Sequence, residues 1–139
     1  MKLSVKSDHA ARAVLGLARH HAEGTALRVE DLAGEQGVPA NYLVQILIEL
    51  KAQGIVRSVR GKQGGYLLAR PPAQITLGDI LRAVHGKVFD TPALSDPACP
   101  LELKNAWLKL QQTLEAAADA IHFEQVLGDG GDKKEMYYI

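Results

Sequence analysis

The chain has 139 residues and 47% hydrophobic residues, which fit one compact domain with a small appendage. Its N-terminus is too polar for a signal peptide or a membrane span, and one cysteine excludes an intrachain disulfide, so a cytoplasmic protein is expected. The net charge of zero divides unevenly: residues 1–72 hold 10 Lys and Arg against 6 Asp and Glu, a balance of +4, and residues 73–139 hold 6 against 10, a balance of −4. This predicts a basic half that meets an anionic partner and an acidic half that does not.

Three helices are predicted before residue 54, the first over about residues 7–22. The second opens at Val29 with acids in its first turn, where the helix dipole favours them, and ends near Gly37. The third covers about residues 40–53, and its core-facing residues recur at three- and four-residue spacing: Tyr42, Leu43, Ile46, Leu47 and Leu50. The second and third helices with their short connection have the order of a helix-turn-helix.

The other face of the third helix has a different composition. It carries Asn41, Val44, Gln45, Ile48 and Lys51. Amides at the exposed start of such a helix can bond base edges in the major groove of DNA. This face is therefore the predicted recognition surface.

A basic hairpin is predicted over residues 54–72, with strands at 55–59 and 66–69 and a glycine-rich turn at 60–65. Residues 50–72 contain no acid, and five cations lie on or next to the hairpin: Lys51, Arg57, Arg60, Lys62 and Arg70. Such a hairpin can contact a phosphate backbone or a minor groove, as the wing of a DNA-binding domain does. The alternative is an ordinary surface hairpin with solvated cations. Its position directly after a helix-turn-helix favours the wing.

The second half of the chain predicts a dimerisation element. Thr76 to Asp79 form a capping box that opens a helix ending at Gly86, and residues 87–98 read as a linker with two prolines. A long helix over about residues 100–121 carries a heptad seam of Leu103, Trp107, Leu110, Leu114, Ala117 and Ile121. We expect this seam to pack against a two-fold copy of the chain. The alternative is that it packs back on its own domain.

The predicted fold class is therefore mainly α with a small β wing. The expected organisation is a winged helix-turn-helix domain at 1–86, a linker at 87–98, a dimerisation helix region at 99–127 and a flexible C-terminal tail at 128–139.

The hairpin sequence resembles the signature of a known family. Residues 57–70, RSVRGKQGGYLLAR, followed by ITLGDI at 75–80, are similar to the motif of the Rrf2 winged helix-turn-helix regulators, which include the IscR, NsrR and CymR types. The first four residues, the start of the third helix and the dimer helix also fit, so the resemblance covers nearly the whole chain. It implies a homodimeric bacterial transcription regulator, and we expect it to act as a repressor. The sequence offers no catalytic constellation, so an enzyme is not expected.

The resemblance also implies which residues meet DNA. They are Asn41, Tyr42 and Gln45 on the recognition helix, with Arg57, Arg60, Gly61, Lys62, Gln63, Gly64 and Tyr66 on the wing. Arg60 would enter the minor groove. Val44 departs from the pattern, because IscR-like members carry a glutamate there, so the target site is expected to differ from theirs.

Many members sense a signal through an iron–sulfur cluster held by three cysteines in the linker. This chain has only Cys99, at the last of those positions. Asp8 falls where NsrR-like members provide a carboxylate across the dimer, and His9 lies beside it. Because one thiolate is too few for the usual ligand set, no cofactor is predicted. The alternative is an iron–sulfur, metal or redox-sensing regulator with mixed ligands from Asp8, His9 and Cys99 across the dimer.

The C-terminus indicates a different input. A polar, glycine-containing stretch at 128–135 precedes Met136, Tyr137, Tyr138 and Ile139. This end resembles that of CymR-type members, which repress genes of cysteine and sulfur metabolism and are controlled by cysteine synthase, whose active site accepts tails ending in isoleucine. A carboxylate nest and a small apolar pocket would suit Ile139. The alternative is that the tail folds back on its own chain.

Overall fold

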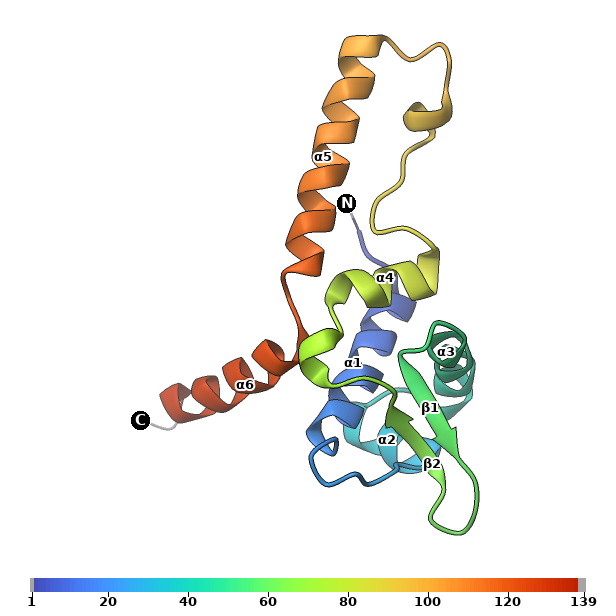
Figure 1. The fold of residues 1–139 in the computed structure, drawn as a ribbon, viewed down its shortest axis with the longest axis vertical. Coiled ribbons are helices and arrows are strands. Elements are labelled where there is room, and N and C mark those ends of the chain that lie inside the picture. The colour runs from blue at the N-terminus through green and yellow to red at the C-terminus, as the bar shows by residue number, and fades with distance from the viewer. Residues whose placement is uncertain (1, 138–139) are drawn as a thin grey trace.

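The computed structural model describes residues 2–137, with side chains up to residue 130, as six α-helices, two strands and two short 3-10 helices (Figure 1). The elements follow in the order α1 (Val5–Arg19), α2 (Val29–Gln36), α3 (Ala40–Ala52), β1 (Val56–Val59), β2 (Gly65–Leu68), η1 (Pro72–Gln74), α4 (Leu77–His85), η2 (Pro92–Ser95), α5 (Leu101–Asp119) and α6 (Phe123–Tyr137). The predicted class, mainly α with a small wing, is confirmed.

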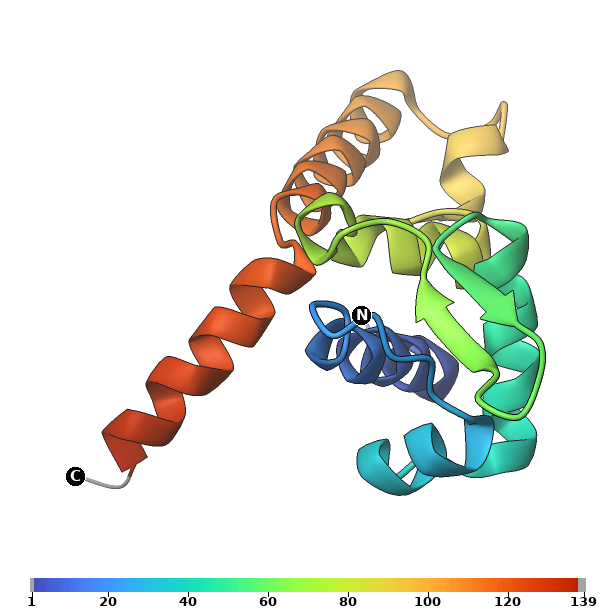
Figure 2. The same ribbon diagram turned by 60° about the horizontal axis from the view of Figure 1, so that its bottom comes forward.

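Helix α1 is the centre of the domain, and α2, α3, α4 and α6 all pack against it (Figure 2). Its small and branched residues allow close approach on several sides, and Ala10, Ala13 and Val14 are fully buried. The helix begins two residues before the predicted start, because the Ser4 hydroxyl caps it by accepting a hydrogen bond from the Ser7 amide at 3.1 Å. The core that results holds the helix-turn-helix rigidly beside the wing.

The wing is an antiparallel hairpin in which Val56 pairs with Leu68 and Val59 pairs with Gly65. It has a third partner that the sequence did not indicate, since Leu27 exchanges two backbone hydrogen bonds with Tyr66, at 3.0 and 2.8 Å. Gly65 has a φ of +151°, and a Cβ there would collide with the Leu27 carbonyl. A glycine is therefore required where the wing meets the segment before α2.

Helix α4 confirms the predicted capping box. The Asp79 amide donates to the Thr76 hydroxyl at 3.1 Å, and the Thr76 amide donates to the Asp79 carboxylate at 3.0 Å. Gly86 ends the helix in the left-handed conformation with a φ of +79°.

Helix α5 stands away from the winged domain, and none of its residues is buried (Figure 1). The linker returns along one of its sides, where Phe89 stacks on Trp107 with ring centroids 6.3 Å apart. The side chain of Gln111 also donates to the Phe89 carbonyl at 3.3 Å.

The segment after α5 differs from the prediction of a flexible tail starting at residue 128. Helix α6 spans Phe123–Tyr137 and so runs through most of that tail. Phe123 is only 2% exposed, and its amide donates to the Ile75 carbonyl at 3.0 Å. The helix was missed because Gly128 and Gly130 have poor helix propensity, whereas its start is set by packing far away in the sequence.

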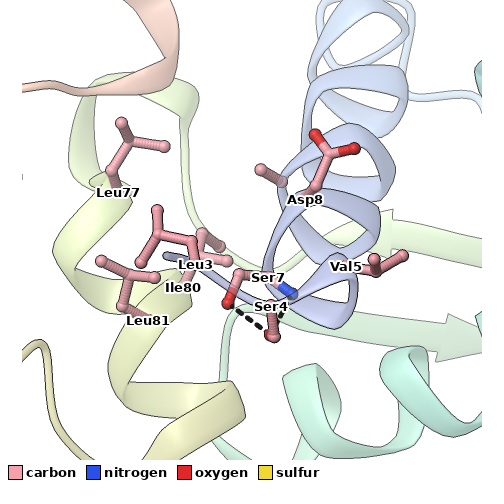
Figure 3. A pocket seen from close by; sticks show the side chains of 9 residues that line it. Leu3, Ser4, Val5, Ser7, Asp8, Leu77, Ile80 and Leu81 are labelled. Carbon is pink, nitrogen blue, oxygen red and sulfur yellow. Dashed lines mark hydrogen bonds between the residues drawn. The ribbon is translucent and has the colours of Figure 1, made fainter. Parts of the chain in front are cut away.

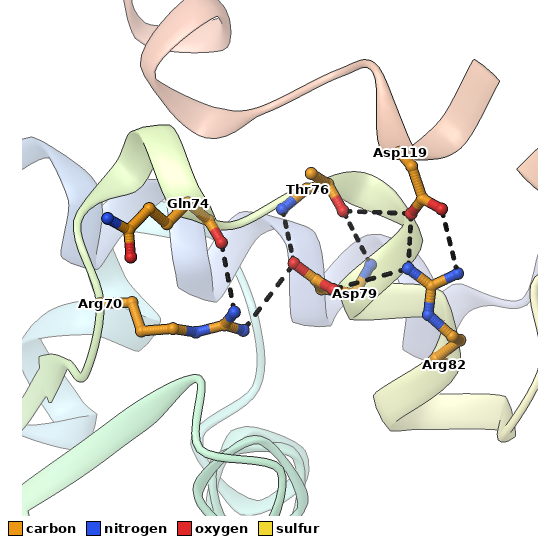
Figure 4. A network of polar contacts seen from close by, with 6 residues as sticks. All are labelled: Arg70, Gln74, Thr76, Asp79, Arg82 and Asp119. Carbon is orange, nitrogen blue, oxygen red and sulfur yellow. Dashed lines mark hydrogen bonds and ion pairs between the residues drawn. The ribbon is translucent and has the colours of Figure 1, made fainter. Parts of the chain in front are cut away.

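A chain of charged contacts joins the wing to α5 (Figure 4). Arg70, which follows β2, lies 3.8 Å from the Asp79 carboxylate, and Arg82 lies 3.5 Å from the same carboxylate. Arg82 also donates to Asp119 at the end of α5, and this hydrogen bond is the main reason that the pKa of Arg82 lies above its ordinary value. A Cβ at Gly78 would collide with the Asp119 carboxylate, so that glycine permits the close approach.

Within residues 2–137, no helix is both long enough and apolar enough to cross a lipid bilayer.

Candidate nucleic-acid interface

Helix α3 presents two distinct faces. Leu43, Ile46, Leu47 and Leu50 are buried in the core, and Asn41, Val44, Gln45 and Ile48 are exposed. Tyr42 was predicted both as a core residue and as a DNA contact, and the core assignment is wrong because its side chain is 61% exposed. Asn41, Val44, Gln45 and Ile48 thus share the exposed face of α3, and Tyr42 is exposed toward the hollow between α1 and α3.

The turn of the wing is exposed at the residues that carry the predicted contacts. Arg57, Arg60, Gly61, Lys62 and Gln63 all lie at the surface. Three donors and a glycine on the turn, with Arg57 nearby on β1, suit a phosphate backbone or a narrow groove.

Two other predicted wing residues have a structural role. Gly64 is buried, its amide donates to the Gly61 carbonyl at 3.0 Å, and a Cβ there would collide with Val59. Tyr66 is half-buried and packs against the core while its backbone pairs with Leu27. Both residues shape the turn that presents Arg60 and Lys62.

Sequence reasoning missed one residue that positions the wing. Arg28, just before α2, donates from its guanidinium to the carbonyl of Lys62 at the wing tip. A second contact connects the end of α3 to the wing, since the Lys51 ammonium donates to the Ser58 hydroxyl at 2.7 Å. No sequence signal indicates the Arg28 contact, because its partner is a backbone carbonyl 34 residues later.

Glu49, the acidic residue of α3, does not neutralise the positive charge of the wing. Glu49 pairs with Lys6 on α1 at 2.7 Å, so its charge is balanced on the side of α3 that faces α1. The exposed cations of the wing have no such partner on the hairpin, which contains no Asp or Glu. A positive strip therefore runs from the end of α3 onto the wing.

The three candidate metal ligands, Asp8, His9 and Cys99, lie in three separate places. Asp8 pairs with Arg12 at 3.0 Å and borders a largely apolar hollow of about 360 Å³ between α1 and α4 (Figure 3). His9 borders a second hollow, which lies between α1 and α3. Cys99 is half-buried before α5, with its Sγ 3.7 Å from the Pro100 carbonyl oxygen.

These residues do not fit an iron–sulfur cluster within one chain. Among the side chains that the structure describes, no three or more His, Cys, Asp or Glu come together as metal ligands. The sequence supplies a single thiol, whereas such clusters are held mainly by several thiolates.

The predicted dimer seam on α5 is partly turned toward its own linker. Leu103 and Leu110 on α5 and Ile121 just after it are exposed, whereas Trp107 and Leu114 are half-buried. The continuous exposed stripe, spaced by three and four residues, consists of Leu103, Ala106, Leu110, Thr113, Ala117 and Ala120. We call these six residues the α5 stripe.

The predicted partner tail cannot be placed. Tyr138 and Ile139 lie outside the described residues, and Tyr137 is described only as the last residue of α6.

The comparisons with known proteins agree with this geometry. A family model described as "Rrf2: Iron-dependent Transcriptional regulator" matches residues 3–129. The chain belongs to the Rrf2 family. It is 30% identical over 141 residues to the HTH-type transcriptional regulator CymR of Bacillus subtilis, with all of both chains covered.

Solved structures give the same result. The chain is similar to the T. potens IscR structure with a TM-score of 0.79 and 33% identity, over 99% of this chain and 97% of that one. It is similar to the structure of CymR, described as the global cysteine regulator of B. subtilis, with a TM-score of 0.78 and 27% identity, over 91% of this chain and 95% of that one. This Rrf2 protein is thus a helix-turn-helix DNA-binding transcriptional regulator of a family that is not enzymatic.

Proposed function

We propose that this Rrf2 protein binds DNA as a sequence-specific homodimer, with α3 in the major groove and the wing turn at 60–65 in the adjacent minor groove. The observation that carries the proposal is the joint exposure of Asn41 and Gln45 beside an acid-free wing that Arg28 holds against the helix-turn-helix. Amides on α3 would supply base contacts, and the wing cations would supply phosphate and minor-groove contacts.

The α5 stripe supports the two-fold arrangement. The stripe consists of apolar and small residues at heptad spacing on a helix about 28 Å long, and exposing such a stripe to water is unfavourable in free energy. Burial against a second copy would remove it from solvent and place two recognition helices on one face of DNA. Such a dimer reads two half-sites about 34 Å apart.

We further propose that the protein represses genes of cysteine and sulfur metabolism. Similarity to CymR over the full chain supports this pathway, and the single cysteine argues against a cluster-based signal. The proposed signalling partner is cysteine synthase, which would take up Ile139. Deletion of Ile139 should abolish binding to cysteine synthase, whereas Lys134→Ala should not, and equal binding of all three proteins would contradict this partner.

The DNA-binding proposal is tested by selecting bound sequences from a random duplex library with the purified protein. We expect a near-palindromic motif, with affinity that falls steeply as salt rises because phosphate contacts release counterions. If no motif is recovered, or if the motif contains a single half-site, the proposal of sequence-specific binding by a homodimer is wrong.

A further inference from the structure

The recognition face of α3 holds an apolar pair that the amide contacts do not explain. Val44 is 38% exposed and Ile48 is 50% exposed, although both belong to the helix that supplies four residues to the core. Branched aliphatic side chains have weak helix propensity and gain nothing from exposure to water. Both side chains thus leave a substantial part of their surface in water.

Val44 and Ile48 alternate with the two amide residues, Asn41 and Gln45, along the helix. Residues 41, 44, 45 and 48 are three or four positions apart, so their side chains form one continuous patch on the helix surface. Asn41 precedes Val44, and Gln45 precedes Ile48, by three residues, which is nearly one helical turn. Any surface that the two amides contact is therefore within reach of Val44, and Ile48 extends the same contact.

The surroundings of the patch identify its occupant. Lys51 at the end of α3 and Arg57 and Arg60 on the wing make the region basic, which suits nucleic acid better than an apolar protein partner. In the major groove only one base edge offers an apolar group, the 5-methyl of thymine. On this face the amides can hydrogen-bond to base edges, and the aliphatic side chains can contact the methyl groups of neighbouring thymines.

Resting on the proposed docking of α3 in the major groove, we propose that Val44 and Ile48 are specificity-determining residues that select thymine 5-methyl groups. Val44, in the second turn of α3, contacts the methyl group nearest the centre of the half-site. Ile48 is about 6 Å further along the helix axis, a distance of about two base steps, and contacts a second methyl group. The predicted half-site therefore contains one thymine between the bases read by Asn41 and Gln45 and a second thymine beyond the base read by Gln45.

Deoxyuridine tests the proposal, because it lacks the 5-methyl group and keeps every hydrogen-bonding group of thymine. Once a bound sequence has been selected, each thymine of the half-site is replaced singly and the dissociation constant is measured. At the two contacted thymines the affinity should fall about fourfold, the size expected for losing one buried methyl group. Replacements elsewhere in the duplex should have no effect.

Variants assign the effect to the side chains. Val44→Ala should weaken binding to thymine DNA and erase the difference between thymine and deoxyuridine at one position, and Ile48→Ala should do so at the other. Both sites are exposed and alanine favours the helix, so folding is preserved. Gln45→Ala is the control: it should weaken binding to both DNAs by the same factor and leave the methyl effect intact.

The outcomes separate this inference from the docking on which it rests. If Gln45→Ala weakens binding but deoxyuridine is tolerated throughout the half-site, or if the half-site has no thymine, methyl selection is wrong and the docking stands. If neither Gln45→Ala nor Val44→Ala changes the affinity for the selected sequence, α3 does not read DNA and both are overturned.

Discussion

Helices α3 and α5 are both amphipathic, yet they meet the rest of the molecule in opposite ways. Four residues of α3 are buried, its C-terminal end is tied by Lys6–Glu49 and Lys51–Ser58, and one face remains exposed. Helix α5 has no buried residue, and its inner side contacts its own linker and α4. Helix α3 is thus fixed within one chain, whereas α5 has an exposed apolar surface.

The difference suits two separate roles, DNA contact for the winged domain and dimerisation for α5. The domain of α1 to α4 with the wing carries its own core, so it can present a pre-formed surface to DNA. In the proposed dimer a second copy would cover the α5 stripe, and the contacts Arg82–Asp119 and Arg70–Asp79 connect α5 to the wing through α4 (Figure 4). Dimerisation would therefore set the relative position of two rigid recognition surfaces.

The largest expected effect comes from a charge in the α5 stripe. Leu110→Glu places a carboxylate where a partner helix would be apolar, so the protein should become monomeric at micromolar concentration. Its affinity for a two-half-site operator should fall about 10² to 10⁴-fold, because the second half-site no longer benefits from linkage. Sedimentation and a DNA titration measure the two effects.

Leu108→Glu is the matched control, since residue 108 lies on the opposite side of the same helix from the stripe. It should remain a dimer. A dimer with Leu110→Glu would show that α5 does not use this face.

The next effect concerns the junction of the wing. Gly65→Ala forces a Cβ against the Leu27 carbonyl at a positive φ, and should cost about 1–3 kcal/mol of unfolding free energy. Gly34→Ala adds the same methyl to an open position in α2 and should stabilise the protein by about 0.5–1 kcal/mol. Urea unfolding compares them, and equal stability of the two variants would be inconsistent with the tight Leu27 junction.

Loss of the wing tip cation should be more selective. Arg60→Ala should weaken DNA binding about tenfold, within the range for one lost groove contact, and leave folding and the dimer unchanged. Lys87→Ala removes an exposed cation from the linker and should bind like the parent protein. An unchanged shift titration with Arg60→Ala would remove the wing turn from the interface.

The smallest effect is expected at the link between α4 and α5. Asp119→Asn removes the charge opposite Arg82, and because both side chains are about 40% exposed the loss should be at most about 1 kcal/mol and smaller at high salt. Glu115→Gln on the same helix should have no effect on unfolding. A salt-independent loss with Asp119→Asn would point to packing at Gly78 and not to charge.

Sequence reasoning anticipated the features that depend on local chemistry. The hairpin, the capping box at Thr76 and Asp79 and the helix end at Gly86 follow from nearby residues, and all are present. The sequence did not predict which side of α5 faces the linker, because a heptad pattern cannot show that Trp107 is turned toward Phe89.

Helix α6 and the Arg28 contact were missed because their causes are distant in the chain. Phe123 is held by Ile75, and Arg28 is held by the wing tip at Lys62. Neither pairing has a signature in the local sequence.

The central claim, that two α3 helices read the major groove with the wings beside them, is tested most directly by chemical footprinting on the selected operator. Dimethyl sulfate reports guanine N7 in the major groove, and hydroxyl radicals report the minor-groove edge of the backbone. We expect two major-groove protections about 34 Å apart, each with a neighbouring protected backbone segment that Arg60→Ala exposes. A single protected patch, or protection of the minor groove alone, would contradict the claim.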